Sequence, residues 1–426
     1  MTNPLDLLAE RGFVQDVTDP DELRRLLGSE RVTFYYGADP TATSLHIGNL
    51  VGIMAMAWLQ RSGHRPIALA GGGTGRIGDP SFRDDERPLL DEGTIRANMA
   101  RISEQMGRVL DLSSPEVGIV LDNQAWLGDL GLVEFLRDVG KHFSVNQMIA
   151  RESVRRRLDE REHGISFTEF SYQLLQAYDF AHLYVAQGCR VQIGGSDQWG
   201  NITAGIDLTR RMHGGKVFGI VWPLIERSDG KKFSKSGGDA VWLAADETSP
   251  YAYYQWFLNV PDADVGRFLK LFTFLPVEEI NALEVASAAE PSARIAQRRL
   301  AEETTRIVHG DAGLEAATRA TAVLFGDDPF AGLDERTVVD AFAEAPSVTL
   351  DTRRLVDGIG VLDVMVATGA AASNGEARRL ISQGGVRVNN APVTDPAAAV
   401  GPADLLAGAV IVLRVGKKRY FLARFA

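Results

Sequence analysis

Hydrophobic residues follow two alternating patterns along the first two hundred residues. Short apolar runs, typical of buried strands, alternate with longer stretches in which apolar residues return every three or four positions, as on one face of a helix. These patterns predict strands at 32–36, 66–70, 118–122 and 190–193, with helices at 48–63, 94–109 and 168–187 between them. Strand–helix alternation with glycines at the turns predicts an α/β fold, a doubly wound parallel sheet of the Rossmann type.

The rest of the chain changes character twice. From residue 250 to about 325, the spacing of apolar residues predicts four helices, at 252–258, 262–273, 277–289 and 294–308. The stretch 326–358, which contains Asp, Pro and Gly, predicts a linker with a short helix. After it, the pattern predicts a helix pair at 361–368 and 374–383 and two strand pairs over 386–393 and 409–425. The chain therefore ends in a small α+β segment.

The composition is that of an ordinary soluble globular protein, with 45% hydrophobic and 24% charged residues among 426. A chain of this length is too long for one compact core, so two or three domains are expected. No apolar run is long enough for a membrane span, and the N-terminus has no basic-then-apolar leader. The single cysteine, Cys189, excludes an internal disulfide and suits a reducing cytoplasm, which is the predicted location.

The net charge of −11 argues against a nucleic-acid partner until its distribution is considered. Residues 351–426 hold ten Lys and Arg against six Asp and Glu, a balance of +4, whereas the other 350 residues carry −15. Nucleic-acid binding depends on local basic surface rather than on the total. A solvated charged surface explains any one basic residue of the tail, but their concentration predicts RNA contact through Arg378, Arg379, Arg387, Lys417 and Lys418.

Two short motifs carry the chemistry, PTATSLHIGN at 40–49 and KKFSKS at 231–236. The first places His46 and Gly48 at the start of a predicted helix, where free backbone N–H groups and the helix dipole favour a polyphosphate. Gly48 lacks a Cβ, so a flat base can lie against the backbone. The second lies between glycines, and its lysines can fold over a leaving pyrophosphate. Either motif alone is weak, but in this order they predict a protein that binds ATP and attacks its α-phosphate.

Two further features bear on a binding site. Asp179 lies in an otherwise apolar and aromatic helical stretch, and a buried carboxylate needs a hydrogen-bond partner. A substrate hydroxyl is one such partner, and a helix end is the alternative. The glycine run 71–75 lacks the Gly-Lys-Ser/Thr ending of a phosphate-binding loop, so we expect these glycines to let backbone pass close to a substrate.

The order of the two motifs resembles that of class I aminoacyl-tRNA synthetases, and the residues between them narrow the resemblance to the bacterial tyrosyl-tRNA synthetase family. The C-terminal segment resembles the S4 RNA-binding module. The resemblance covers essentially the whole chain and implies an enzyme that activates L-tyrosine with ATP and passes it to the 3′ end of tRNA(Tyr). It rests on YYGADPT at 35–41, GDPS at 78–81, ISFTEFSYQLLQAYDF at 165–180, VQIGGSDQWGNITAG at 191–205, TSPY at 248–251 and IVHG at 307–310.

The resemblance implies a role for each matching residue. The tyrosine-binding residues would be Tyr35, Asp39, Asp79, Tyr172, Gln176, Asp179, Gln192 and Gln198. The ATP-binding residues would be Gly48, Asn49, Gly195, Asp197, Lys232, Lys235 and Ser236, while Thr41, His46, Lys232 and Lys235 would stabilise charge on the phosphates. Asn49 departs from the family, which usually has histidine there, although an amide N–H can replace the imidazole N–H. Arg151 and Arg155 would touch the tRNA acceptor arm.

The resemblance also implies three domains and a set of partners. The domains are a Rossmann-like catalytic domain at 1–230 with a helical dimerisation insert at about 125–165, a loop and helical anticodon-arm-binding domain with linker at 231–350, and an S4-like domain at 359–426. The partners are L-tyrosine, ATP with Mg²⁺, tRNA(Tyr) and a second copy of the chain; no structural metal, tightly bound cofactor or membrane is expected. Three alternatives stay open: a tryptophanyl-tRNA synthetase-like ligase, a nucleotidyltransferase with the same His-x-Gly motif, and a non-catalytic RNA-binding scaffold.

Overall fold

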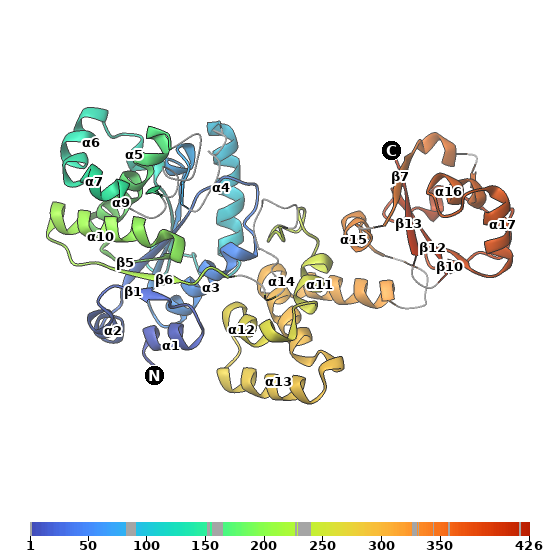
Figure 1. Ribbon diagram of the computed structural model, residues 1–426, viewed down its shortest axis with the longest axis horizontal. Helices are drawn as coiled ribbons and strands as arrows, with labels where there is room; N and C mark the ends of the chain where they lie inside the picture. The colour runs from blue at the N-terminus through green and yellow to red at the C-terminus, as the bar shows by residue number, and fades with distance from the viewer. Residues whose placement is uncertain are drawn as a thin grey trace. The chain divides into compact units, whose positions relative to one another are not determined.

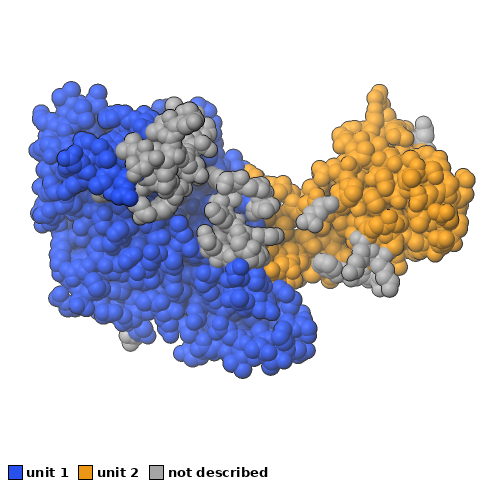
Figure 2. Space-filling model, viewed as in Figure 1, with its two compact units in different colours: residues 1–243, 260–300 blue, residues 244–259, 301–426 orange. Residues whose placement is uncertain are grey.

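The chain forms two compact units. The computed structural model describes residues 2–81, 91–150, 154–155, 165–225, 228, 240–325, 330, 332–343, 345–356, 358–416 and 419–426. One unit comprises Met1–Leu243 and Val260–Leu300, and the other Ala244–Asn259 and Ala301–Ala426 (Figure 2). Figure 1 labels many of the elements of both units.

The first unit is built on a six-stranded sheet whose neighbouring strands are parallel, except that β1 is antiparallel to β6. The strands lie in the order β1 (Asp16–Val17), β6 (Phe218–Trp222), β5 (Cys189–Gly195), β2 (Thr33–Ala38), β3 (Arg65–Ala70) and β4 (Ile119–Asp122). The chain runs outward from β2 to β4 and then returns to the other side of β2, so the strand order reverses between β2 and β5. This confirms the predicted doubly wound sheet, and in such sheets ligands bind at the reversal, outside the carboxyl ends of the strands.

Helices cover both faces of this sheet (Figure 1). On one side, α3 (Ile47–Arg61) and α4 (Glu92–Gly107) contact β3, and on the other α9 (Phe167–Gln187) packs on α10 (Trp199–His213) and against β5. Reciprocal side-chain bonds between Ser166 and Glu169 cap the start of α9, and Gly188, with φ of 62°, ends it. The described part of this unit also contains α1 (Pro4–Glu10), α2 (Pro20–Ser29), α5 (Gln124–Leu127), α6 (Leu132–Asp138), α7 (Val145–Ile149), α12 (Asp262–Phe272) and α13 (Val277–Ala289).

The helix predicted at 294–308 is longer than expected. Helix α14 spans Ile295–Phe325, because helical structure resumes after an interruption at Gly310, whose φ of 71° lies in the left-handed region. In the second unit, α11 (Pro250–Leu258) and α15 (Glu335–Ala341) contact each other. The remaining predicted helices are present within a few residues of their expected bounds. Among the described residues, no helix has the length and apolar character needed to cross a bilayer.

The end of the second unit is a small α+β fold, as predicted. Helices α16 (Val361–Ala367) and α17 (Asn374–Ser382) share a hydrophobic core with the strands. Asn389 and Asn390, with φ of 47° and 65°, form the two-residue hairpin turn between β9 and β10. The main sheet has the order β10 (Ala391–Pro392), β9 (Val386–Val388), β12 (Val410–Val415), β13 (Arg419–Phe425) and β7 (Ser347–Leu350), and β8 (Ile359–Gly360) pairs with β11 (Ala399–Val400).

Candidate active site

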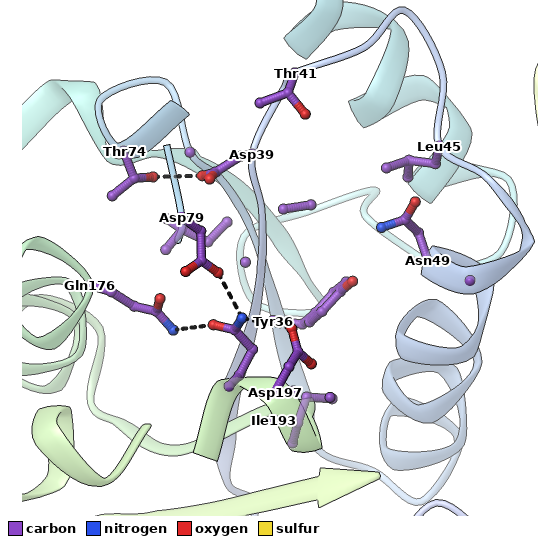
Figure 3. Close-up of a pocket in the computed structure, with 18 of the residues that line it drawn as sticks. Tyr36, Asp39, Thr41, Leu45, Asn49, Thr74, Asp79, Gln176, Ile193 and Asp197 are labelled. Carbon is purple, nitrogen blue, oxygen red and sulfur yellow. Dashed lines mark hydrogen bonds between the residues drawn. The ribbon is translucent and has the colours of Figure 1, made fainter. Parts of the chain in front are cut away.

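A pocket of about 680 Å³ opens in the first unit where the strand order reverses. Its walls come from the ends of β2 and β5, the segment leading into α3, α9, and the turn after β6. Figure 3 shows Asp39 and Gln176 on one wall, with Leu45 and Asn49 across from them. The predicted residues that line this pocket are Tyr35, Asp39, Thr41, His46, Gly48, Asn49, Asp79, Tyr172, Gln176, Asp179, Gln192, Gly195, Asp197 and Gln198. Lys232, Lys235 and Ser236 lie outside the described residues.

The closed end of the pocket brings together Tyr35 from β2 and Asp179 from α9, each 1% exposed. Within the described chain, the Tyr35 hydroxyl has no hydrogen-bond partner. Asp179 accepts a bond from Asn123 Nδ2 at 2.9 Å and another from Trp126 Nε1 at 2.8 Å. Its partners are therefore side chains and not the helix end that the sequence left open.

Burial controls the ionisation of both groups at this end. It raises the pKa of Asp179 to about 7, against the lowering effect of the bonds from Asn123 and Trp126. Burial also raises the pKa of Tyr35 well above its usual value, and the charge of Asp179 adds to this effect. The closed end therefore holds a neutral phenol that lacks a partner beside a carboxyl group that titrates near neutral pH.

A network of polar side chains forms the adjoining wall (Figure 3). Asp39 accepts bonds from the Tyr172 hydroxyl at 3.0 Å and the Thr74 hydroxyl at 2.8 Å. Gln198 Nε2 donates to Asp79 at 2.7 Å, and Gln176 Nε2 donates to Gln198 Oε1 at 3.2 Å. Two carboxylates in this wall make it suited to a positively charged group.

The glycine run after β3 makes room for this wall. A Cβ on Gly71 would lie 2.0 Å from an Asp39 carboxylate oxygen and 2.5 Å from the Thr74 hydroxyl, and one on Gly72 would lie 2.2 Å from an Asp122 oxygen. We expected these glycines to bring the backbone close to a substrate. The structure shows instead that they make room for the protein's own polar side chains, because the atoms that a Cβ would meet belong to Asp39, Thr74 and Asp122.

Helix α3 begins at the pocket, as predicted, but its first backbone N–H groups are not free. Ile47 N–H donates to the Val241 carbonyl at 3.1 Å, and Gly48 N–H donates to His46 Nδ1 at 3.0 Å. The next two N–H groups donate to the His46 carbonyl, and the Asn49 side chain accepts from His46 N–H at 3.1 Å. The expectation of free backbone donors for a polyphosphate is therefore wrong. The helix dipole and nearby side chains remain available to an anion.

Tyr36 is a pocket residue that the sequence did not single out. Burial raises the pKa of its hydroxyl to about 12, and a hydrogen bond with the Asn49 side chain partly offsets this. Its ring lies 5.6 Å from that of Trp222 between centroids. Gly52 leaves space for both rings, since a Cβ there would lie 2.8 Å from Tyr36 and 3.0 Å from Trp222.

Asp197 and Leu224 flank the pocket beyond β5 and β6. Burial raises the pKa of Asp197, and Gln198 Nε2 donates to its carboxylate at 3.0 Å. A Cβ on Gly195 would lie 2.4 Å from Asp197 Oδ1, so the absence of a side chain at this position leaves room for the Asp197 carboxylate. Leu224 lines the pocket with a 54% exposed apolar side chain, a residue that the sequence offered no pattern to find.

Five of the predicted RNA-binding residues lie in the C-terminal segment, after the last residue that lines the pocket. In the second unit, Arg378 and Arg379 are exposed on α17, and Arg387 on β9 donates to the Asn390 carbonyl at 3.0 Å. Arg414 is the cross-strand partner of Arg387 and donates to Asn390 Oδ1 at 3.0 Å. Arg155, in the first unit, is exposed. Arg151, Lys417 and Lys418 lie outside the described residues.

Within the part of the chain that the structure describes, no group of three or more His, Cys, Asp or Glu side chains is placed to hold a metal ion.

Comparison with known proteins agrees with this geometry. The family of class I tRNA synthetases (W and Y) matches residues 28–326, and the C-terminal domain of tyrosine–tRNA ligases of the SYY type matches residues 337–423. A tyrosine–tRNA ligase of Roseiflexus castenholzii is 49% identical over 426 residues, the full length of both chains. That of Geobacillus stearothermophilus is 48% identical over 427 residues, 99% of this chain and all of the relative.

Solved structures give the same result. A C-terminally truncated mitochondrial tyrosyl-tRNA synthetase of Aspergillus nidulans has a TM-score of 0.69 at 33% identity, and covers 76% of this chain and 95% of its own. A tryptophanyl-tRNA synthetase of Plasmodium falciparum, at 14% identity and a TM-score of 0.54 over 73% of this chain and 84% of its own, shares the fold. The chain therefore belongs to the tyrosyl-tRNA synthetase family of class I synthetases.

Proposed function

We propose that the pocket binds L-tyrosine at its closed end and ATP beside α3, and joins the tyrosine carboxylate to the α-phosphate with release of pyrophosphate. The chain is a tyrosine–tRNA ligase, so ATP, tyrosine and tRNA are its substrates. In the second step, tyrosine passes to the 3′ end of tRNA(Tyr). The single observation that supports the pocket assignment most strongly is the buried Tyr35 hydroxyl, which has no partner among the described residues and lies near the Asp179 carboxyl.

A tyrosine side chain would satisfy both groups at the closed end. Its phenol oxygen can accept from Tyr35 while its O–H donates to Asp179. A side chain without the hydroxyl would leave the buried Tyr35 hydroxyl without a partner among the described residues and Asp179 without a third hydrogen-bond donor, at a cost of about 1–3 kcal/mol for each. An indole lacks a hydroxyl at this position, so the same pair disfavours tryptophan.

The polar wall would hold the amino acid's charged end. Asp79, Tyr172 and Gln176 suit the ammonium group, with Asp39 fixing the Tyr172 hydroxyl at 3.0 Å. Gln192 is buried, and its Oε1 has no partner among the described residues. We assign Gln192 and Gln198 to the carboxylate and the reacting centre, where an amide can turn to present N–H or oxygen.

The chemical step needs positioning and charge stabilisation more than proton transfer. The tyrosine carboxylate is already a nucleophile, so no general base is required. We propose that Thr41 and His46 donate to the phosphates and that Lys232 and Lys235 neutralise the leaving pyrophosphate. Preorganised donors of this kind lower the barrier because they meet charge that grows in the transition state.

The nucleoside would lie between α3 and the end of β5. Asp197 can accept from the ribose hydroxyls beside Gly195, and Gly48 lets the base approach the backbone. Asn49 and Tyr36, which bond each other, lie on the same side of the pocket and suit the ribose edge. The exposed Leu224 offers an apolar surface to the base.

Mg²⁺ would enter on the phosphates of ATP. This ion keeps several waters and binds through one or two carboxylates together with substrate phosphates. The pocket carboxylates of Asp39, Asp79 and Asp197 already accept hydrogen bonds from neighbouring side chains. The phosphate oxygens and water are thus the ligands that suit the ion here, and its charge would offset that of the pyrophosphate.

The insert predicted at about 125–165 supports a homodimer. Helices α6 and α7 lie beside α9 (Figure 1), and α6 carries Phe135 against Tyr178 of α9. Helices α6 and α7 and the start of α9 also expose large apolar side chains, including Phe167 of α9 at 78%. The others are Leu132, Val133, Leu136, Val145 and Ile149. A second copy of the chain would bury them, and sedimentation equilibrium should give about twice the chain mass of 46.3 kDa. A monomer that still charges tRNA contradicts this.

The tail at 359–426 and the helices before it would bind tRNA(Tyr). We propose contact through Arg378, Arg379, Arg387, Lys417 and Lys418, and contact of the acceptor arm with Arg151 and Arg155. Phosphate contacts supply most of the affinity in such surfaces and make it salt-dependent. We place the enzyme in the cytoplasm, where the lone Cys189 stays reduced; burial raises the pKa of this thiol to about 12.

Tyrosine-dependent exchange of radioactive pyrophosphate into ATP tests the proposed function with the purified full chain. The expected result is exchange with tyrosine, little with phenylalanine or tryptophan, and none without an amino acid. Exchange that is faster with tryptophan, or equal with all three amino acids, would overturn the assignment of the pocket.

A further inference from the structure

The irregular segment at 40–45 links β2 to α3 and forms one wall of the pocket. Figure 3 shows it passing from Thr41 to Leu45 before α3 begins. The residues of this segment that line the pocket are Thr41, Ala42, Ser44 and Leu45. An irregular segment does not repeat the ladder of bonds that fixes a helix or a strand, so bonds to neighbouring elements decide where it lies.

Two buried amide side chains of α4 bond to this segment. Asn98 Nδ2 donates to the Pro40 carbonyl at 3.0 Å, at one end of the segment. Gln105 Oε1 accepts from Leu45 N–H at 2.9 Å and from the Ser44 hydroxyl at 3.2 Å, at the other end. Asn98 is 4% exposed and Gln105 5%, so both amides lie where a hydrogen bond is stronger than in water.

The spacing of the two amides suits a helix that supports the whole segment. Residues seven apart lie on the same face of an α-helix, two turns and about 10.5 Å from each other along its axis. Ile102 lies between Asn98 and Gln105 on this face, and its buried side chain lines the pocket. Helix α4 therefore contacts the wall along one stripe and sets the distance between the two ends of the segment.

We propose that Asn98 and Gln105 are positioning residues that hold this wall of the pocket in the place where ATP binds. Neither is among the described residues that line the pocket, so both act through the backbone of the segment at 40–45. This inference rests on the proposed binding of ATP beside α3. Because the bonds join parts of the chain to each other, little binding energy is spent on ordering the wall when ATP enters.

Loss of the Gln105 acceptor should impair the use of ATP and leave tyrosine binding intact. Gln105→Met keeps a side chain of similar length but takes the side-chain acceptor away from Leu45 N–H. From the usual net value of one hydrogen bond, kcat/KM for ATP in pyrophosphate exchange should fall by roughly three- to tenfold. The dissociation constant for tyrosine, measured by equilibrium dialysis, should change less than about twofold, because Tyr35 and Asp179 come from β2 and α9.

Two further variants separate the position of the wall from the stability of the fold. Gln105→Glu keeps an oxygen that can accept from Leu45 N–H, so it should restore most of kcat/KM for ATP. Gln60→Met is the same substitution near the far end of α3, where Gln60 Oε1 accepts from Asp111 N–H at 2.9 Å. It should lower the melting temperature but leave kcat/KM for ATP within about twofold of the parent.

Asn98→Leu tests the other end of the segment. Leucine has a similar shape but no N–H to donate to the Pro40 carbonyl, so kcat/KM for ATP should fall here as well. This variant decides the question if circular dichroism shows that Gln105→Met is unfolded. Parent values of kcat/KM for ATP in the folded variants, an equal loss in Gln60→Met, or an equal loss of tyrosine affinity would overturn the proposal. A parent enzyme without tyrosine-dependent exchange would instead reject the proposed function.

Discussion

Trp126→Phe should move the pH dependence of tyrosine binding. Trp126 Nε1 donates to Asp179 at 2.8 Å, and this bond is one of two that lower the pKa of a carboxyl which burial raises to about 7. A hydrogen bond to a charged group contributes about 1.5–3 kcal/mol, and one pKa unit corresponds to about 1.4 kcal/mol. Losing the bond should therefore raise the pKa of Asp179 by roughly one to two units.

The ionised carboxylate is the form that accepts the substrate's O–H, so affinity should follow its population. At pH 7.5 the Asp179 carboxyl is ionised in about three quarters of the parent molecules but in only roughly 3–25% of the variant molecules. The variant should therefore bind tyrosine roughly three- to twenty-fivefold more weakly at this pH. The difference should shrink to less than about twofold at pH 9.5. Equilibrium dialysis with labelled tyrosine from pH 6 to 9.5 measures this. His182→Gln is the control, because it removes the ring stacked 4.4 Å from Trp126 but keeps the bond to Asp179. A loss of affinity that is equal at every pH would refute the reasoning.

Three further predictions follow from the same pocket. Tyr35→Phe should lower kcat/KM for tyrosine by roughly 5- to 150-fold while the melting temperature stays level or rises, because its buried hydroxyl has no partner among the described residues; a matched fall in stability would argue against the assignment. Gly52→Ala should raise the KM for ATP but not for tyrosine, since its Cβ would lie 2.8 Å from Tyr36, and adding Tyr36→Ala should relieve the clash; an unchanged KM for ATP in Gly52→Ala would count against it. Burial raises the pKa of Asp179 from 3.8 to about 7, so the parent loses stability as pH rises through this range, whereas Asp179→Asn lacks that loss. Between pH 5 and pH 8, the free energy of unfolding measured in urea should fall by about 2–3 kcal/mol more in the parent than in Asp179→Asn. An equal fall in both proteins would contradict the pKa shift.

Periodicity predicted the elements with long, regular patterns and missed the short ones. Strands β2 to β5 and the long helices α3, α4 and α9 were found because their apolar residues repeat over many positions, whereas the short helices α5, α6 and α7 were not predicted individually. Strand β1 has two residues, and β7 pairs with β13 some seventy residues later, so neither leaves a local signal. Strand β6 and helix α10 carry apolar patterns that could have been recognised.

The site followed a similar division. The motifs contain the residues that were predicted to bind tyrosine and ATP. Those of them that the structure describes all line one pocket. The residues that support them were missed, because Asn123 and Trp126 act on Asp179 across more than fifty positions and lie in no motif. The backbone donors of α3 were wrongly expected to be free, since the acceptor for Ile47 N–H comes from Val241, nearly two hundred residues away.

The most direct test of the account is the ratio of kcat/KM for tyrosine to that for phenylalanine in pyrophosphate exchange. If Tyr35 and Asp179 both bind the phenol hydroxyl, the parent enzyme should favour tyrosine by at least about a hundredfold, because phenylalanine offers neither an acceptor to the buried Tyr35 hydroxyl nor a third donor to the buried Asp179 carboxylate. The double variant Tyr35→Phe with Asp179→Ala should reduce that preference to less than about tenfold. A parent enzyme that uses both amino acids equally, or a double variant that keeps the full preference, would contradict the assignment of the closed end.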